Sequence, residues 1–176
     1  MNDEQTRARF ETLMLPLAND AYNLARWLMK NQEDAEDAVQ ESYLRAFRFF
    51  ASFQGTNFRG WLLRIVRNTC YTALGARKLR DKEVPLEEEA DEIEDHSPLP
   101  PVNLARKATV EAVREAIAGL PVEFREAVVL RELEGLSYKE ISEVTEVPIG
   151  TVMSRLARAR HQLYLILVNR KELDQL

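Results

Sequence analysis

Apolar residues near the C-terminus recur four, three, four and three residues apart, the period of one helix face. These positions are Val152, Leu156, Ala159, Leu163 and Ile166. Upstream, Ser137 and Glu140 have the spacing of a capping box, which predicts that a short helix begins at Tyr138. Thr145 to Pro148 interrupts that helix, because proline disfavours helical geometry at the residue before it. The pattern predicts two helices joined by a tight turn.

The second of these helices begins near Ile149 or Gly150 and is much more basic than the first. Between Val147 and Lys171 there are five basic residues and no acidic one. The face opposite the apolar one carries Thr151, Met153, Ser154, Arg155, Ala157, Arg158 and Arg160. A helix-turn-helix places such side chains in the major groove of DNA. The pattern favours a reader of duplex DNA, and a helical hairpin with solvated arginines is the alternative.

Two further helices precede this pair. Asn103 is predicted to cap a helix that ends at Ala118, and a second helix runs from Val122 to Glu134, with Gly135 as its C-terminal stop. The inward positions of the second are Phe124, Ala127, Val128 and Leu133. These helices complete a small C-terminal helical domain.

The first eighty residues predict three helices. One runs from Glu4 to about Lys30 with a kink at Pro16, and Asn31 caps the next, whose first turns are acidic. The inward positions of that second helix are Ala35, Ala38, Val39, Ser42, Ala46 and Phe49 or Phe50. A loop follows, and Thr56 or Asn57 caps a third helix. Its inward positions are Phe58, Trp61, Leu62, Ile65, Val66 and Thr69.

Eight aromatic residues lie between Tyr43 and Tyr71, and residues 42–80 contain eight basic residues and no acidic one. Most of the rings are needed for the core of so small a domain. Aromatic side chains beside a loop and near arginines also form a platform on which unpaired bases stack. Both interpretations, core and single-stranded nucleic-acid binding, remain open at this point.

The net charge of −5 is unevenly distributed. Eight acidic residues lie between Glu83 and His96, so the remainder of the chain carries a net charge of +3. With the sequence SPLPPV, this stretch predicts a linker at 81–103 between domains at 1–80 and 104–176. No segment has strand periodicity. We therefore expect an all-α fold of two small helical domains, joined by an acidic flexible linker, with the helix-turn-helix in the second.

Composition excludes several classes of function. One cysteine, Cys70, and two distant histidines, His96 and His161, provide neither an internal disulfide nor a usual zinc site. There is no plausible catalytic constellation, so we expect no enzyme, no metal and no cofactor. The longest apolar run, at 163–168, has six residues and the first ten residues lack a signal-peptide core, so we expect a cytoplasmic protein with no stable membrane insertion.

Three stretches resemble the extracytoplasmic function (ECF, group 4) sigma factors of bacterial RNA polymerase. They are DAEDAVQESYLRAF at 34–47, FRGWLLRIVRNTCYTAL at 58–74 and LPVEFREAVVLRELEGLSYKEISEVTEVPIGTVMSRLARARHQL at 120–163. Their order and spacing also match that family. The resemblance implies a sigma factor that directs core RNA polymerase to promoters, opens the −10 region and acts in a stress or envelope response. A free-standing helix-turn-helix regulator of transcription is the alternative.

The resemblance also implies roles for individual residues. Core polymerase would bind Asp34, Asp37, Gln40 and Glu41. The single-stranded −10 element would contact Phe53, Gln54, Asn57, Arg64, Arg67 and Asn68, with Asn68 near a flipped base. The duplex −35 element would contact Thr151, Met153, Ser154, Arg155, Ala157, Arg158 and Arg160. Met153 and Ala157 depart from the bulkier or polar residues common in the family. An anti-sigma factor is the further partner expected.

Overall fold

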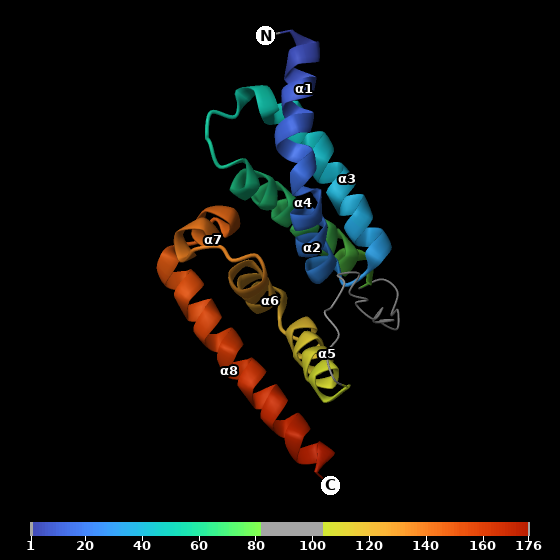
Figure 1. Cartoon of the computed structure of the whole chain (residues 1–176), viewed down its shortest axis with the longest axis vertical. Coiled ribbons are helices and arrows are strands. Elements are labelled where there is room, and N and C mark those ends of the chain that lie inside the picture. Colours follow the sequence, from blue (N-terminus) through green and yellow to red (C-terminus); the bar gives the residue numbers. More distant parts are fainter. Residues whose placement is uncertain (1, 82–103, 176) are drawn as a thin grey trace. The chain divides into compact units, whose positions relative to one another are not determined.

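The structure is a computed structural model that describes residues 2–81 and 104–175, with side chains for 2–80 and 109–175. All regular structure in these ranges is helical, which confirms the predicted fold class. The helices form two compact units, one with α1 to α4 and one with α5, α6, η3 and α8 (Figure 1). Beyond Asp81, the last residue of α4, the predicted linker lies outside the described residues, as does the proposed cap Asn103.

The first unit begins with two helices that the sequence predicted as one kinked helix. α1 (Asp3–Met14) and α2 (Ala18–Met29) are joined by η1 (Leu15–Leu17), a 3-10 turn with Pro16 in its first positions. Proline has no N–H to donate and clashes with the preceding turn, so the α-helix breaks there. Lys30, at φ 59°, ends α2 in the left-handed conformation. The predicted kink is confirmed.

The next two helices begin at asparagine caps. Asn31 Oδ1 accepts from the backbone N–H of Asp34 at 2.9 Å and starts α3 (Gln32–Phe49), as predicted. The short η2 (Phe50–Ser52) and a loop lead to α4 (Phe58–Asp81). There Asn57 Oδ1 accepts from the N–H of Gly60 at 2.9 Å, so of the two predicted caps it is Asn57 that fills this role.

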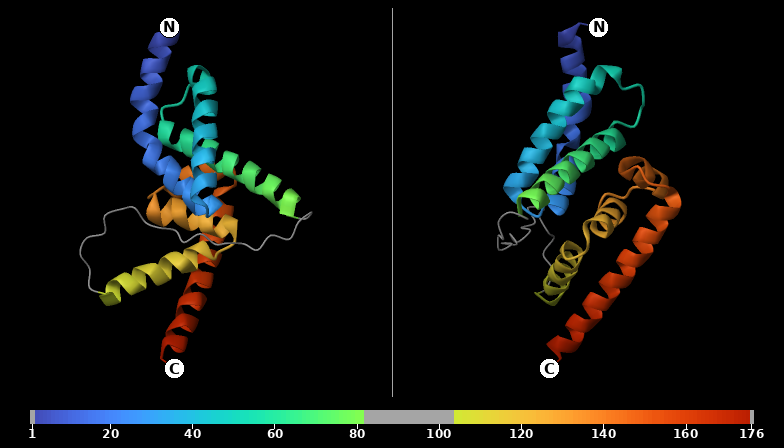
Figure 2. Two further views of the ribbon diagram at one scale, coloured as in Figure 1. Left: turned by 90° about the vertical axis from the view of Figure 1, so that its right-hand side faces the viewer. Right: turned by 180° about the vertical axis from the view of Figure 1, so that it is seen from behind.

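The core of the first unit lies where α2, α3 and α4 pack against one another (Figure 2). Small residues on α3 allow the close approach of its neighbours, since Ala35, Ala38, Ser42 and Ala46 are all buried. At the end of α3, Phe50 is buried and Phe49 is 54% exposed, which decides between the two predicted inward positions. Residues buried on α4 are Trp61, Leu62, Leu63, Val66, Thr69 and Cys70, of which Leu63 was not predicted.

In the second unit, a π-helical turn changes which residues face inward. α5 (Leu104–Ala118) is followed by α6 (Val122–Val128) and by η3 (Val129–Leu133), the π turn, in which the N–H of Glu134 donates to the carbonyl of Val129. Gly135, at φ 71°, ends the helix as predicted. Leu133 was expected inward but is 51% exposed. A π turn holds more residues than an α turn, so Leu133 rotates off the face that Leu130 continues.

The predicted helix pair is present. Ser137 Oγ accepts from the N–H of Glu140, and Glu140 Oε1 accepts from the N–H of Ser137, both at 3.1 Å, which confirms the capping box of α7 (Tyr138–Thr145). α8 (Ile149–Asp174) follows, with Val152, Leu156 and Ala159 buried. Ile166, expected inward, is 39% exposed. α8 has 26 residues whereas α5 and α6, which pack on it, have 15 and 7, and its last turns are less covered.

A buried arginine ties α5 to α6. Arg125 is 5% exposed and donates to the carbonyls of Ala118 and Leu120, at 3.2 and 2.9 Å. It thereby satisfies acceptors at the C-terminal end of α5, where a cation is also favoured by the helix dipole. In the part of the chain that the structure describes, no helix has the length and apolarity needed to span a bilayer.

Candidate nucleic-acid and partner interfaces

The loop between α3 and α4 is held in place by stacked rings. Phe53 lies on Trp61 with ring centroids 4.5 Å apart and planes 18° from parallel, and it meets Phe58 edge-on at 5.3 Å. Trp61 is only 8% exposed, whereas Phe53 is half-buried. Trp61 is therefore the buried member of the stacked pair, and Phe53 is the member that stays partly accessible.

The backbone of the loop passes close to that accessible ring. A Cβ atom at Gly55 would lie 2.5 Å from Cζ of Phe53, so only glycine allows this approach without movement. Gln54 and Asn57, the other predicted −10 residues in the loop, are exposed. Asn57 also caps α4, so its Oδ1 already accepts a backbone hydrogen bond. The loop thus presents polar groups around a partly exposed aromatic face.

The predicted −10 residues of α4 form one stripe. Arg64, Arg67 and Asn68 are three and four residues apart, and Tyr71 extends the stripe by one turn. The guanidinium of Arg67 lies 3.8 Å from the centroid of the Tyr71 ring and donates to Asn68 Oδ1 at 3.3 Å. The structure therefore brings Arg67 and Asn68 together. Tyr71 was not predicted as a site residue, although its position seven residues after Arg64 could have indicated it.

The acidic residues predicted to bind core polymerase differ in their contacts. Asp34 forms an ion pair with Arg77 of α4, with Oδ2 and Nη1 3.1 Å apart. Glu41 pairs with Arg45 one turn further along α3, at 2.9 Å. Asp37 and Gln40 are exposed. Asp37, Gln40 and Glu41 occupy one stripe on the outer face of α3, whereas the Asp34 carboxylate is turned toward α4.

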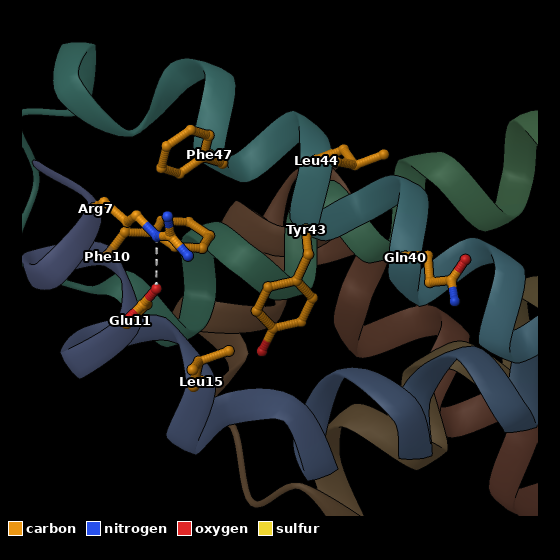
Figure 3. A pocket seen from close by; sticks show the side chains of 8 residues that line it. All are labelled: Arg7, Phe10, Glu11, Leu15, Gln40, Tyr43, Leu44 and Phe47. Atoms are coloured by element: carbon orange, nitrogen blue, oxygen red, sulfur yellow. Dashed lines mark hydrogen bonds and ion pairs between the residues drawn. The ribbon is translucent and has the colours of Figure 1, made fainter. Parts of the chain in front are cut away.

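An apolar groove runs beside that stripe, between α1 and α3 (Figure 3). It has a volume of about 640 Å³ and is lined by Arg7, Phe10, Glu11, Leu15, Gln40, Tyr43, Leu44 and Phe47. Leu44 is 65% exposed, Leu15 is 55% exposed and Phe47 is 46% exposed, so the groove presents a contiguous apolar surface. Sequence reasoning missed Leu44 and Phe47, although they follow Gln40 at helical spacing on the polar face of α3.

Tyr43 lines this groove and joins the two elements beside it. Its hydroxyl donates to the carbonyl of Met14 at 2.7 Å and so anchors α3 to the end of α1. Burial, with a smaller contribution from the negative charge of Asp20, raises the pKa of Tyr43 to about 12. The phenol thus stays neutral well above physiological pH.

The outer face of α8 carries the residues predicted to read the −35 element. Met153, Ser154, Ala157, Arg158 and Arg160 are exposed, and Thr151 and Arg155 are half-buried. Ser154 Oγ donates to the carbonyl of Thr151 at 3.1 Å, which leaves its lone pairs available. Short polar, basic and small apolar side chains are thus presented together on the first turns of one helix.

Arg160 is engaged within its own unit. Its guanidinium donates to Glu132 Oε1 at 2.9 Å. This hydrogen bond raises the pKa of Arg160, and a hydrogen bond to Tyr138 makes a smaller contribution in the same direction. Tyr138 in turn lies under the guanidinium of Arg131, 4.8 Å from the ring centroid. These contacts link α8 to η3 and to the start of α7, so Arg160 stabilises the packing of the helix pair in this structure.

Within residues 2–81 and 104–175, no group of three or more His, Cys, Asp or Glu side chains is arranged to hold a metal ion. Cys70 is buried and reduced, as expected of a small apolar core residue.

Comparison with protein families matches both units. Residues 13–80 match Sigma-70 region 2, and residues 110–163 match Sigma-70, region 4. Among curated relatives, the ECF RNA polymerase sigma-E factor of Haemophilus influenzae is 37% identical over 147 residues, which is 80% of this chain and 77% of that protein. The RNA polymerase sigma-H factor of Pseudomonas aeruginosa is 34% identical, over 88% of this chain and 83% of that protein.

Two further proteins extend the comparison. The ECF RNA polymerase sigma factor SigE of Mycolicibacterium smegmatis is 37% identical over 92% of this chain, which spans 62% of that longer relative. The solved structure of the sigma factor RpoE in complex with the anti-sigma factor NepR from Bartonella quintana has a TM-score of 0.77 and 26% identity. It covers 90% of this chain and 96% of RpoE.

An all-helical chain with both sigma regions in this order is a transcription initiation factor of the Sigma-70 class. Its relatives at 34–39% identity place it more narrowly: the chain belongs to the ECF sigma factors of bacterial RNA polymerase. The free-standing regulator considered as the alternative is not supported by these matches.

Proposed function

We propose that this ECF sigma factor binds core polymerase and promoter DNA through three separate surfaces. The observation that carries the proposal is that one chain has an exposed acidic stripe on α3, an aromatic loop beside α4 and a basic outer face on α8. Residues 1–80 would form the domain that binds core polymerase and the −10 element, residues 81–103 the linker, and residues 104–176 the domain that binds the −35 element.

Core polymerase would contact the outer face of α3. Asp37, Gln40 and Glu41 supply charge and hydrogen bonds there, and the groove beside Leu44 supplies apolar area. An apolar centre with a charged rim is the usual composition of a protein interface. Asp34 would add to this surface only after its ion pair with Arg77 opens.

The loop and α4 would hold the displaced strand of the −10 element. A base that leaves the duplex loses stacking worth a few kcal/mol, and stacking on an aromatic ring returns about 1–3 kcal/mol. Phe53, supported by Trp61, offers such a ring, and Asn68 offers an amide for a flipped base. Arg64 and Arg67 would bind phosphate. Opening of the promoter would then be selective binding of the single strand, with no chemistry by this chain.

The outer face of α8 would read the −35 element in duplex form. A bidentate arginine to guanine is worth about 1–3 kcal/mol, and Arg155 and Arg158 are the candidates for it. Each phosphate contact made by these residues would release counterions and make binding salt-dependent. We propose that the protein acts in the cytoplasm, where core polymerase and promoter DNA are found, without enzymatic activity of its own.

An anti-sigma factor is a further proposed partner. The support is the likeness to RpoE, whose solved structure contains the anti-sigma factor NepR. Capture of this chain from its native host under resting conditions, followed by release of polymerase-directed transcription when the captured partner is removed, would identify that factor. A role in a stress or envelope response would follow from the signal that releases it.

Run-off transcription tests the central proposal. Purified core polymerase is mixed with genomic promoter fragments, with and without this chain. We expect discrete initiation only when the chain is present, and dependence of each start on sequences upstream. If the chain binds core polymerase but produces no start on any fragment, the proposed function is wrong.

A further inference from the structure

The first turns of α8 carry an exposed apolar stripe that is not part of the buried core. Ile149 is 44% exposed, Met153 is 53% exposed and Ala157 is also exposed. These residues are four positions apart, so they lie along one side of the helix. The core of the same turns is formed by Val152, Leu156 and Ala159, which are buried.

The surroundings of the stripe are those of a nucleic-acid surface. Ser154 and Arg158 are exposed on the same turns, and Thr151 and Arg155 are half-buried there. No acidic residue occurs between Val147 and Lys171. An anionic partner complements this charge, and it must also present something apolar to Met153 and Ala157. Duplex DNA meets both requirements in the major groove, where thymine carries a C5-methyl group on its exposed edge.

We propose that Met153 and Ala157 contact thymine C5-methyl groups in the −35 element and make thymine a determinant of its sequence. The inference rests on the proposed function, in which α8 enters the major groove. Alanine is among the side chains that make apolar contact with this methyl group. Met153 is long, unbranched and polarizable, so it can follow the uneven floor of the groove. Arginine at these two positions would instead favour guanine. A large aromatic ring there would demand more space.

The test uses the complete holoenzyme, formed from core polymerase and the full chain. A duplex library randomised upstream of a fixed −10 element is first selected for binding. Each thymine of the selected upstream element is then replaced by deoxyuridine, which removes the methyl group and leaves the pairing edge unchanged. We expect at least one replacement to weaken binding about fourfold, because one buried methyl group is worth about 0.8 kcal/mol.

Two variants assign that effect to residues. Met153→Gln keeps the length and helix propensity but adds a polar amide, and Ala157→Gly removes the methyl group; in at least one of them the deoxyuridine effect should fall below about 1.5-fold. Leu173→Ala is the matched control, because Leu173 is also exposed and apolar, at 70%, but lies near the far end of α8. It should retain the full fourfold effect.

The outcomes are distinguishable. A selected element without thymine, deoxyuridine replacements without effect, or an effect that survives in both variants would overturn the inference while leaving the −35 role of α8 intact. A holoenzyme that selects no upstream sequence at all would overturn the −35 role itself. If Met153→Gln instead weakens binding to core polymerase with DNA binding unchanged, the stripe is a protein-docking surface and the inference is wrong.

Discussion

The ring of Phe53 stacks on that of Trp61 with centroids 4.5 Å apart, although one residue lies in a loop and the other on α4. We expect the two to differ in what they contribute. Trp61→Ala removes a buried ring and should lower the free energy of unfolding by about 3–5 kcal/mol. Phe53→Ala loses mainly the ring pair, about 0.5–1.5 kcal/mol, and should impair promoter opening more than folding. Urea unfolding and permanganate reactivity of promoter thymines measure the two effects.

Phe49→Ala is the control for Phe53, because Phe49 is an exposed ring just before the loop and does not contact Trp61 in the described structure. Its promoter opening should match that of the wild type. Equal defects in the Phe49 and Phe53 variants would show that the stacked pair has no special part in opening.

Asn68 offers an amide beside Arg67 on the stripe of α4. We expect Asn68→Ala to reduce formation of the open complex between about twofold and tenfold, the effect of one lost neutral hydrogen bond. Affinity for core polymerase should not change, since the predicted polymerase surface lies on α3. Asn169→Ala, on the exposed part of α8, serves as the control. An unchanged open complex in the Asn68 variant contradicts the flipped-base role.

Asp34 and Asp37 are one helical turn apart but differ in their partners. Asp34 is paired with Arg77, whereas Asp37 is exposed. Asp37→Asn should therefore weaken binding to core polymerase about tenfold or more, and Asp34→Asn less than threefold. Loss of the half-exposed Asp34 ion pair should cost at most about 1 kcal/mol of stability. Titration of labelled core polymerase at two salt concentrations measures the affinities of the two variants. The reverse order of affinities would refute the assignment.

Arg158 and Arg160 should contribute unequally to −35 binding. Arg158 has no ion pair within the described part of the chain, while Arg160 is held by Glu132. Arg158→Ala should lower affinity and reduce the dependence of log K on log salt by about 1. Arg160→Ala should change affinity less than threefold, and Glu132→Gln, which releases Arg160, should strengthen binding slightly. Binding of the holoenzyme to −35 duplexes across a salt series measures these effects. A larger loss of affinity for Arg160→Ala than for Arg158→Ala would contradict the assignment.

Tyr43 predicts a change in alkaline stability. Its pKa is raised to about 12 by burial and by Asp20, so the folded state keeps the proton that the unfolded chain loses near pH 10. The resulting stabilisation is complete below pH 10 and is lost as the pH rises toward 12. Tyr43→Phe should cost about 1 kcal/mol at neutral pH through its lost bond to Met14.

The measurement for Tyr43 is the difference in the free energy of unfolding between the wild type and Tyr43→Phe across about pH 8–11.5, since other groups titrate in both proteins. The wild type should lose stability faster than Tyr43→Phe as the pH rises above 10. Parallel curves for the two proteins would mean that the hydroxyl is not protected in the folded state.

The sequence by itself determined the local features of this protein. The capping box at Ser137 and Glu140, the break at Pro16 and the stop at Gly135 each depend on residues a few positions apart, so they could be predicted without knowledge of the fold. The order of the motifs was also sufficient to indicate the family. Residue roles taken from that resemblance stay predictions until the binding experiments are done.

Only the tertiary structure decided which side chains meet. Asp34 is engaged by Arg77, 43 residues later, and the rings of Phe53 and Trp61 are brought together by a loop whose path no periodicity describes. The π turn that moves Leu133 to the surface has no local sequence marker. Helical periodicity assigns a face to each residue, but the packing of neighbouring helices decides how far that face is covered and which charges are already paired.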